Sequence, residues 1–328
     1  MSPDEPGMST ELVEPAAETA GYAYLGPEGT FTEAALVACL REVGRLEGAY
    51  LLPFSSVEAV LDAVRTGAAV AGMVALENSV EGSVTAVLDG LAFGDPLVIV
   101  RETLLSVSFA LLARPGTALQ DVRTVVSHPH AQPQCRNWLA ANLPQAEWMP
   151  AASNADGARL VSEGAYDAAL AGAFAADVYG LEVLASGVHD VVGAQTRFVL
   201  VSKPVVPESV TGSDKTSLVL VIEQDHPGAL LEILTEFAVR GVNLTRIESR
   251  PTGGGMGDYF FSVDAEGHVD EARVGEALIG LHRICAEVRY LGSYPRVDGV
   301  RPSLRRGVSD AEYGEGQAWL ARIREGRV

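Results

Sequence analysis

Cysteine is scarce in this chain of 328 residues, which contains only Cys39, Cys135 and Cys285, far apart from one another. Their odd number and spacing predict neither a disulfide framework nor a cysteine-rich zinc site. Basic residues are also few, since 24 Lys and Arg stand against 43 Asp and Glu and give a net charge of −19. A phosphate-binding surface needs clustered Lys and Arg, so we expect no nucleic-acid partner and no attraction to an anionic membrane.

Long apolar runs are missing too. No stretch reaches the roughly 18–20 residues needed to span a bilayer, so we expect no membrane partner. Residues 1–19 are acidic and lack the basic and apolar regions of a secretory signal. We therefore expect a soluble, cytoplasmic protein. Residues 1–20 carry Pro, Ser, Thr and Glu without periodicity and are predicted to be a disordered tail.

The hydrophobic fraction of 48% is enough for real cores, and the length suggests about two domains. From residue 22 to residue 202, short apolar runs alternate with stretches of helical periodicity. This alternation predicts an α/β fold with largely parallel strands. Residues 203–214 (KPVVPESVTGSD) have the composition of a linker. The βαββαβ order that follows predicts a ferredoxin-like α+β domain, with a glycine-rich hairpin loop at residues 251–258 (PTGGGMGD).

Polar motifs follow several of the expected strands, at the edge where open α/β sheets bind ligands. They are GPEGTF at 26–31, ENSVEGS at 77–83, SHPH at 127–130 and TRF at 196–198. Each motif alone is explained equally well by a capped turn or an ordinary loop. None matches a nucleotide-binding glycine pattern or a hydrolase nucleophile elbow. His128 and His130 lack a companion ligand at metal-binding spacing, so we expect no metal.

Two further motifs lie in the expected C-terminal domain. HPGAL at 226–230 joins a strand to a helix, and ESRP at 248–251 ends the next strand. Proline in the first turn of a helix and proline at the end of a strand are ordinary turn chemistry. Neither motif would indicate a site if it stood alone.

The ordered series GPEGTF, ENSVEGSV, SHPHAQPQC, YGLEVL, TRF, HPGAL and ESRP resembles the prephenate dehydratase family with a C-terminal ACT regulatory domain. The resemblance extends from Tyr22 to Pro295. Two departures are visible. Ala194 stands where the family usually has Asn, and His130 stands where it often has Gln. Both departures concern the positioning of the substrate.

The resemblance implies a carbon–oxygen lyase that converts prephenate to phenylpyruvate, water and carbon dioxide in L-phenylalanine biosynthesis, without a cofactor. It implies a two-lobed catalytic domain like the type-2 periplasmic binding proteins at residues 21–202. We expect lobe one at 21–104 and 190–202, lobe two at 105–189, a linker at 203–214, an ACT domain at 215–297 and a C-terminal tail at 298–328.

By the same resemblance, Thr196 supplies the essential hydroxyl, which we interpret as a donor toward the leaving oxygen. Arg197, Ser79, Ser127 and the helix start at Thr30 are expected to hold the two carboxylates. Glu77 is the nearest carboxyl group that could supply a proton if burial raises its pKa. The expected catalytic residues are Thr196, Arg197, Phe198, Glu77, Asn78 and Ser79, and the expected substrate-binding residues are Thr30, Phe31, Gly82, Ser127 and His128.

ACT domains of this family pair side by side and bind phenylalanine at their interface, which implies a homo-oligomer, a dimer or a tetramer. An isolated βαββαβ sheet also leaves an edge or an open face to cover. The phenylalanine-binding positions carried over are Gly228, Ala229, Leu230, Asn243, Leu244, Glu248, Ser249, Arg250 and Pro251. Two alternatives stay open: an arogenate dehydratase, and a non-catalytic amino-acid sensor built from the same parts.

Overall fold

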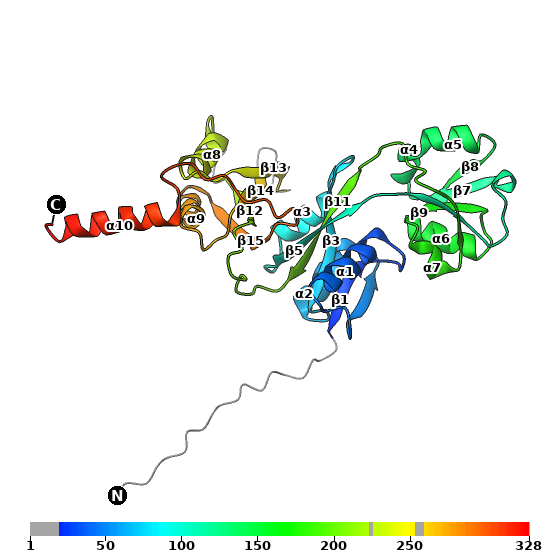
Figure 1. The fold of residues 1–328 in the computed structure, drawn as a ribbon, viewed down its shortest axis with the longest axis horizontal. Helices are drawn as coiled ribbons and strands as arrows, with labels where there is room; N and C mark the ends of the chain where they lie inside the picture. Colours follow the sequence, from blue (N-terminus) through cyan, green and yellow to red (C-terminus); the bar gives the residue numbers. More distant parts are fainter. Residues whose placement is uncertain (1–19, 223–225, 253–258, 328) are drawn as a thin grey trace, which may run out of the picture.

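The computed structural model describes residues 20–222, 226–252 and 259–327. The tail expected at 1–20 and the glycine-rich loop expected at 251–258 therefore lie largely outside the described residues. The chain forms three sheets that follow one another along the long axis of the molecule (Figure 1). Within the described residues, no helix combines the length and the apolar character needed to cross a membrane.

The first sheet forms lobe one and lies in the middle of the molecule. Its strand order is β2 (Tyr50–Phe54), β1 (Gly21–Leu25), β3 (Ala71–Asn78), β11 (Gln195–Ser202) and β5 (Val98–Ser106), with the short β4 (Gly82–Ser83) added to β3. β1, β2 and β3 run parallel, as the sequence predicts, whereas β11 runs antiparallel to both β3 and β5.

Three helices cover this sheet, and α1 and α2 begin at the polar residues that can cap them. The hydroxyl of Thr30 accepts a hydrogen bond from the Glu33 N–H at 3.3 Å and starts α1 (Phe31–Glu42). Ser56 caps α2 (Val57–Thr66) in the same way. One face of the sheet packs against α1, and the other packs against α2 and α3 (Thr85–Ala92).

Lobe two is formed by the chain between β5 and β11. Its sheet has the order β10 (Glu182–Ser186), β6 (Ala110–Ala113), β9 (Ala168–Ala171), β7 (Thr124–Ser127) and β8 (Glu147–Pro150). The 3-10 turn η1 (Leu119–Asp121) and the helices α4 (Ala131–Gln134), α5 (Arg136–Asn142), α6 (Asn154–Ser162) and α7 (Ala175–Tyr179) complete it. Because the chain enters through β5 and returns through β11, these adjacent strands connect the two lobes.

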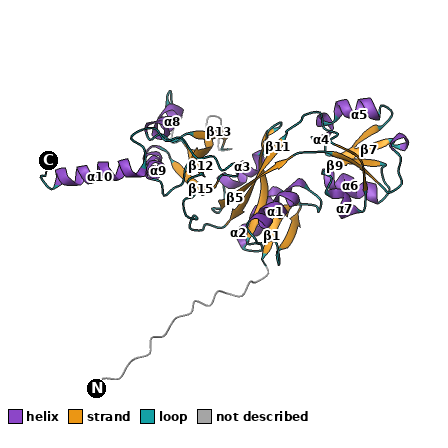
Figure 2. Cartoon of the chain, viewed as in Figure 1, coloured by secondary structure: helices purple, strands orange, loops and turns teal. Residues whose placement is uncertain are grey.

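The C-terminal domain has the expected βαββαβ order: β12 (Asp214–Val221), α8 (Ala229–Val239), β13 (Leu244–Pro251), β14 (Tyr259–Glu266), α9 (Ala272–Ile284) and β15 (Glu287–Pro295). Its sheet order is β13-β14-β12-β15, with every pair antiparallel. Both helices lie on one face, as Figure 2 shows.

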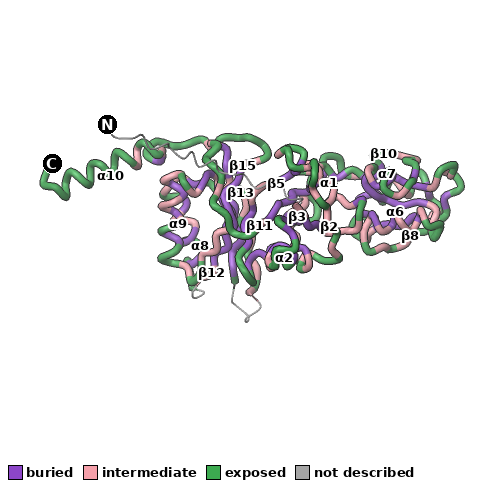
Figure 3. Tube along the Cα trace, turned by 90° about the horizontal axis from the view of Figure 1, so that it is seen from below, coloured by how far each residue is buried: buried purple, intermediate pink, exposed green. Residues whose placement is uncertain are grey.

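The other face of this C-terminal sheet is covered by lobe one. Phe260 and Tyr294 belong to the same buried cluster as Leu91 and Ile99 of lobe one, and Figure 3 shows buried chain continuing across this boundary. The open face that was expected to favour dimerisation is therefore occupied within the chain, and the outer edge of β13 remains. Beyond β15, α10 (Asp310–Arg324) extends away from the body and contains no buried residue (Figures 1 and 3).

Candidate active site and its link to the ACT domain

Thr196 lies on β11 with its side chain toward the α1 side of the lobe-one sheet, opposite Asn78 of β3. The Asn78 side-chain amide donates a hydrogen bond to Thr196 Oγ1 at 2.8 Å. The Asn78 carbonyl oxygen is itself fixed by the N–H groups of Val80 and Glu81, at 2.8 and 3.0 Å. Since the Thr196 oxygen accepts this bond, its own hydrogen stays available for donation to another group.

Ser79 holds the hairpin after β3 against β11. Its N–H donates to the Gln195 carbonyl, and its hydroxyl accepts from the Gln195 N–H, both at 2.9 Å. Gly82 has a φ of 83°, a left-handed conformation that allows the hairpin to turn back as β4. Asn78, Ser79 and Gly82 therefore fix the backbone and the hydroxyl at Thr196.

The motifs of lobe one meet lobe two on two sides. The Phe31 ring makes edge-to-face contacts with Phe109 and Phe174 of lobe two, at centroid distances of 5.8 and 5.1 Å. The Tyr179 hydroxyl of α7 donates to the Glu28 carbonyl at 2.6 Å. The GPEGTF turn is thus part of the junction between the lobes, and the expected contact of Phe31 with the substrate stays a prediction.

The second contact between the lobes comes from Glu81 in the hairpin after β3. One of its oxygens lies 3.0 Å from His130 Nδ1, and the other accepts from the Gln134 side chain at 3.1 Å. His130, which departs from the family pattern, therefore pairs across the junction with a carboxylate. The motifs ENSVEGS and SHPH are brought together, as their positions after strands predicted.

His128 is held beside this contact. Its Nδ1 accepts from the His130 N–H at 3.2 Å, and its own N–H donates to the Asn154 side chain at 3.0 Å. Burial, followed by the neighbouring His130, lowers the pKa of His128. The ring is therefore held neutral, with its proton on Nε2, where it can donate to a ligand.

The hydroxyl groups of Ser127 and Thr30 are both used inside the protein. Ser127 is fully buried, accepts from Trp148 Nε1 at 2.9 Å and donates to the His128 carbonyl. Thr30 donates to the Leu25 carbonyl at 3.1 Å while it caps α1. The expectation that the Ser127 hydroxyl holds a substrate carboxylate is therefore wrong, because its hydrogen is engaged. The expectation for Thr30 concerned the helix start that it caps, and this stays a prediction.

Phe198 does not line the junction. It is 2% exposed and packs in the core beneath α1 with Leu36 and Met73. Phe198, which was expected among the catalytic residues, is therefore a core residue that stabilises the strand that carries Thr196.

Arg197 requires the largest correction. Successive residues of a strand face opposite sides, so its side chain leaves the sheet away from Thr196 and enters the boundary with the C-terminal domain. It is 5% exposed, and it binds Glu102 through Nε at 2.7 Å and Asp264 of β14 through Nη1 at 2.5 Å. Its Nη2 donates to the Tyr294 hydroxyl of β15 at 2.8 Å.

The expected role of Arg197 as the carboxylate anchor is therefore wrong, because its donors are taken by acidic and hydroxyl groups inside the protein. The network is electrostatically consistent. Burial would lower the pKa of Arg197, but the surrounding Tyr294, Asp264 and Glu102 raise it well above its ordinary value. Burial would raise the pKa of Asp264, but Arg197 first, then Arg246 and Lys215, hold it below its ordinary value.

Glu77 belongs to the same network and not to the Thr196 side. It lies 3.1 Å from Arg197 Nη1 and 3.5 Å from Arg246 Nε of β13. Ala75, two residues earlier on β3, faces the α1 side, but a register irregularity between β3 and β11 places Glu77 opposite Arg197. The expectation that Glu77 supplies a proton to the leaving group is therefore wrong.

The ESRP motif also contributes to this boundary. Arg250 binds Asp89 of α3 through two nitrogens, at 3.2 and 2.7 Å, and Glu248 accepts a hydrogen bond from the Ser83 hydroxyl. Ser249 and Pro251 are exposed. Within one chain, Glu248 and Arg250 therefore join β13 to lobe one and do not face a free site.

The remaining positions at which phenylalanine binding was expected lie in two groups. Gly228, Ala229 and Leu230 are at the start of α8, whereas Asn243 and Leu244 follow its end. An α-helix of 11 residues is about 16 Å long, so one chain does not bring the two groups together.

Within the described ranges, no group of three His, Cys, Asp or Glu side chains could hold a metal ion.

Comparison with known proteins gives matches along most of the chain. The family model described as prephenate dehydratase matches residues 22–205, and the ACT domain model matches residues 216–283. A curated prephenate dehydratase of Mycobacterium ulcerans (strain Agy99) is 49% identical over 313 residues, which cover 94% of this chain and 97% of the relative.

Two solved structures are similar as well. A prephenate dehydratase from Arthrobacter aurescens, in complex with L-Phe, has a TM-score of 0.87 and 46% identity, and the match covers 93% of this chain and all of the other. GqqA, described as a novel type of quorum quenching acylase, has a TM-score of 0.75 and 31% identity, with 84% and 97% of the two chains covered.

Proposed function

Since this chain belongs to the prephenate dehydratase family, we propose that Thr196, at the junction of its two lobes, assists the departure of the hydroxyl group of prephenate. The activity is that of a carbon–oxygen lyase: prephenate is converted to phenylpyruvate, water and carbon dioxide in L-phenylalanine biosynthesis. The bond from the ring to its carboxylate breaks, and its electron pair enters the ring. The hydroxyl group leaves with a proton as water.

The observation that carries this assignment is the 2.8 Å hydrogen bond from Asn78 to Thr196 Oγ1. It fixes the rotation of the hydroxyl and turns the hydroxyl hydrogen away from Asn78, so that this hydrogen can be donated to the leaving oxygen. A threonine hydroxyl is too weak an acid to be the final source of the proton. We therefore assign it the role of an oriented donor, or the last member of a relay.

With Arg197 engaged elsewhere, the substrate carboxylates need other donors. The N–H groups at the start of α1 are suitable, because the first turn of a helix has unpaired donors and a favourable dipole. His128 Nε2 is a second donor, carried by lobe two. Donors from both lobes would draw the lobes together around the substrate, while Phe31 packs against its ring.

The experiment is a turnover assay with three substrates at equal concentration: prephenate, arogenate and an acylated quorum-sensing signal. We expect phenylpyruvate to form from prephenate and the other two rates to be at least tenfold lower. Preferential formation of phenylalanine from arogenate would make the chain an arogenate dehydratase. Hydrolysis of the acylated signal would favour the activity described for GqqA, and no turnover of any substrate would favour the amino-acid sensor.

We propose that phenylalanine regulates the enzyme through the ACT domain. The A. aurescens relative was solved with L-Phe, and the ACT domain of this chain contacts lobe one through Arg197, the residue next to Thr196. A displacement of β14 or β15 would therefore reach β11 directly. The backbone donors at the start of α8 suit the carboxylate of the effector, and Asn243 suits its ammonium group.

We also propose that the enzyme is a homo-oligomer, at least a dimer, formed through the ACT domains. Since the two groups of phenylalanine-binding positions lie at opposite ends of α8, a second copy is needed to bring them together. The outer edge of β13 is available for such pairing. Sedimentation of the chain with and without phenylalanine tests this, and a monomer under both conditions would contradict it.

The regulatory site is tested by the ratio of turnover with and without phenylalanine. Asn243→Ala should reduce the response to phenylalanine, because it removes a proposed ligand of the ammonium group. Asn137→Ala, which removes an exposed amide from lobe two, is the matched control and should keep the wild-type ratio. Equal ratios in all three proteins would place the effector elsewhere.

We place the protein in the cytoplasm. Cys39, Cys135 and Cys285 are free thiols, which suits a reducing compartment. We propose that the domains follow the expected limits, with the catalytic domain at 21–202, the linker at 203–214 and the ACT domain at 215–297.

A further inference from the structure

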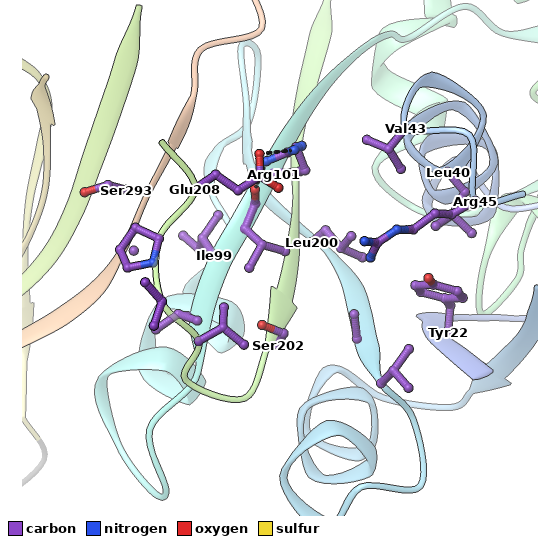
Figure 4. A pocket seen from close by; sticks show the side chains of 18 of the residues that line it. Tyr22, Leu40, Val43, Arg45, Ile99, Arg101, Leu200, Ser202, Glu208 and Ser293 are labelled. Carbon is purple, nitrogen blue, oxygen red and sulfur yellow. Dashed lines mark hydrogen bonds and ion pairs between the residues drawn. The ribbon is translucent and has the colours of Figure 1, made fainter. Parts of the chain in front are cut away.

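A cavity of about 470 Å³ lies beneath the linker that joins the catalytic and ACT domains (Figure 4). A volume of this size is typical of small-molecule sites. Lobe one, the linker and β15 of the ACT domain all contribute to its walls. The apolar part of the lining consists of Leu40, Val43, Val70, Ile99, Leu200 and Val205.

The cavity is separate from the proposed active site. Ser202, at one end of β11, lines the cavity, whereas Thr196 is at the other end of the strand. Six residues of extended chain span about 20 Å. A molecule in the cavity would therefore not touch Thr196.

Two arginines contribute positive charge to this cavity. Arg45, just beyond α1, extends toward Leu200 in Figure 4, and no ion-pair or hydrogen-bond partner of its guanidinium group occurs among the described residues. Arg101 of β5 binds Glu208 of the linker at 2.5 Å and its neighbouring Val100 carbonyl at 2.8 Å. The lining therefore carries two cations and one anion, in a chain whose net charge is −19. A locally positive cavity in a strongly acidic protein favours an anionic ligand.

The Glu208 side chain shows what Arg101 can bind. It is a carboxylate from a segment with linker composition, and it is 64% exposed. It forms an ion pair with the Arg101 guanidinium group at the border of the apolar part of the cavity. A free carboxylate with an apolar body could replace it on Arg101, or bind Arg45 while Glu208 stays in place. In both cases its apolar part would be removed from water against the lining.

We propose that this cavity is a second ligand site, selective for small carboxylates with an apolar ring or branched chain, with Arg45 as the principal anchor. Binding would stabilise the contact between lobe one, the linker and β15. The site is thus placed to alter how the ACT domain sits on the catalytic domain.

The probe is 3-phenylpropanoate, which has the carboxylate and the apolar ring but no ammonium group. Its binding to the full chain is measured by isothermal titration calorimetry. Arg45→Gln should weaken binding by about tenfold or more, because it removes a charge-assisted contact. Arg41→Gln is the matched control: Arg41 is exposed in the last turn of α1 and does not line the cavity, so its affinity should equal that of the wild type.

Glu208→Gln provides a result of opposite sign. It removes the internal competitor for Arg101, so 3-phenylpropanoate should bind several-fold more tightly, which general damage to the fold would not produce. Absence of binding to the wild type at millimolar concentration overturns the proposal. Equal affinities of the wild type and Arg45→Gln overturn it as well, because they place the probe at another site.

Discussion

At Thr196, the hydroxyl and the methyl group can be separated by two substitutions. Thr196→Ala removes the oriented donor, so we expect kcat to fall by about 100-fold or more. Thr196→Ser keeps the donor opposite Asn78 and should retain much more activity. Steady-state kinetics with prephenate measures both.

The control is the thermal unfolding of the two variants, which should resemble that of the wild type because neither change introduces bulk. Equal losses of kcat in the two variants would show that the methyl group, through packing, is what matters at this position.

The lowered pKa of His128 predicts a pH dependence of stability. The unfolded chain takes up a proton at this residue near its ordinary pKa of 6.5, whereas the folded chain takes it up only at lower pH. The unfolded state therefore binds more protons in this interval, and the contribution of His128 to stability is lost as the pH falls through 6.5 toward the folded pKa.

His128→Gln should reduce the slope of melting temperature against pH in the range just below about 6.5. The comparison is made with His226→Gln, because His226 is exposed on the ACT domain. If His128→Gln and the wild type have the same slope, the imidazole titrates in the folded protein as it does in the unfolded chain.

At the scale of the element, β11 carries two functions on its two faces. Thr196 belongs to the lobe junction, and Arg197 to the buried network with Glu102 and Asp264. Arg197→Met keeps much of the volume but leaves two buried carboxylates without their principal partner, so we expect a loss of about 3–5 kcal/mol of unfolding free energy. Denaturant titration measures it.

Arg159→Met is the matched control, because Arg159 forms ion pairs with Asp156 and Glu163 on an exposed helix surface. Its effect on stability should be small. The opposite result would be a strong increase in the KM for prephenate together with wild-type unfolding of Arg197→Met. It would show that Arg197 binds the substrate and that its contacts with Glu102 and Asp264 contribute little to stability.

The arrangement of elements could be predicted from the sequence because each strand and helix has its own local signal. The alternation to residue 202 and the βαββαβ order after it are both present in the structure. These features depend on residues whose types and spacing are visible in short windows.

The role of Arg197 was not predicted, because its partners Asp264 and Tyr294 come from a different domain and have no motif of their own. One signal was present in the sequence. Adjacent residues on a strand face opposite sides, so Thr196 and Arg197 could not both face one site. Ser127 was misassigned for another reason: its hydroxyl donates to the His128 carbonyl and accepts from Trp148, and such bonds depend on side-chain geometry.

At the scale of the whole molecule, the ACT domain is part of the fold of the catalytic domain. Phe260, Leu291 and Tyr294 are buried against lobe one, and Asp264 neutralises Arg197. A chain that ends at Val205 would expose this apolar surface and leave the buried charges unpaired. We expect such a chain to associate, to unfold at a lower temperature and to lose most of its turnover, as measured by light scattering, thermal unfolding and the phenylpyruvate assay.

A monomeric truncated chain with wild-type turnover would show that lobe one is stable without the ACT domain. A truncated chain that kept the full phenylalanine response would place the effector in the catalytic part.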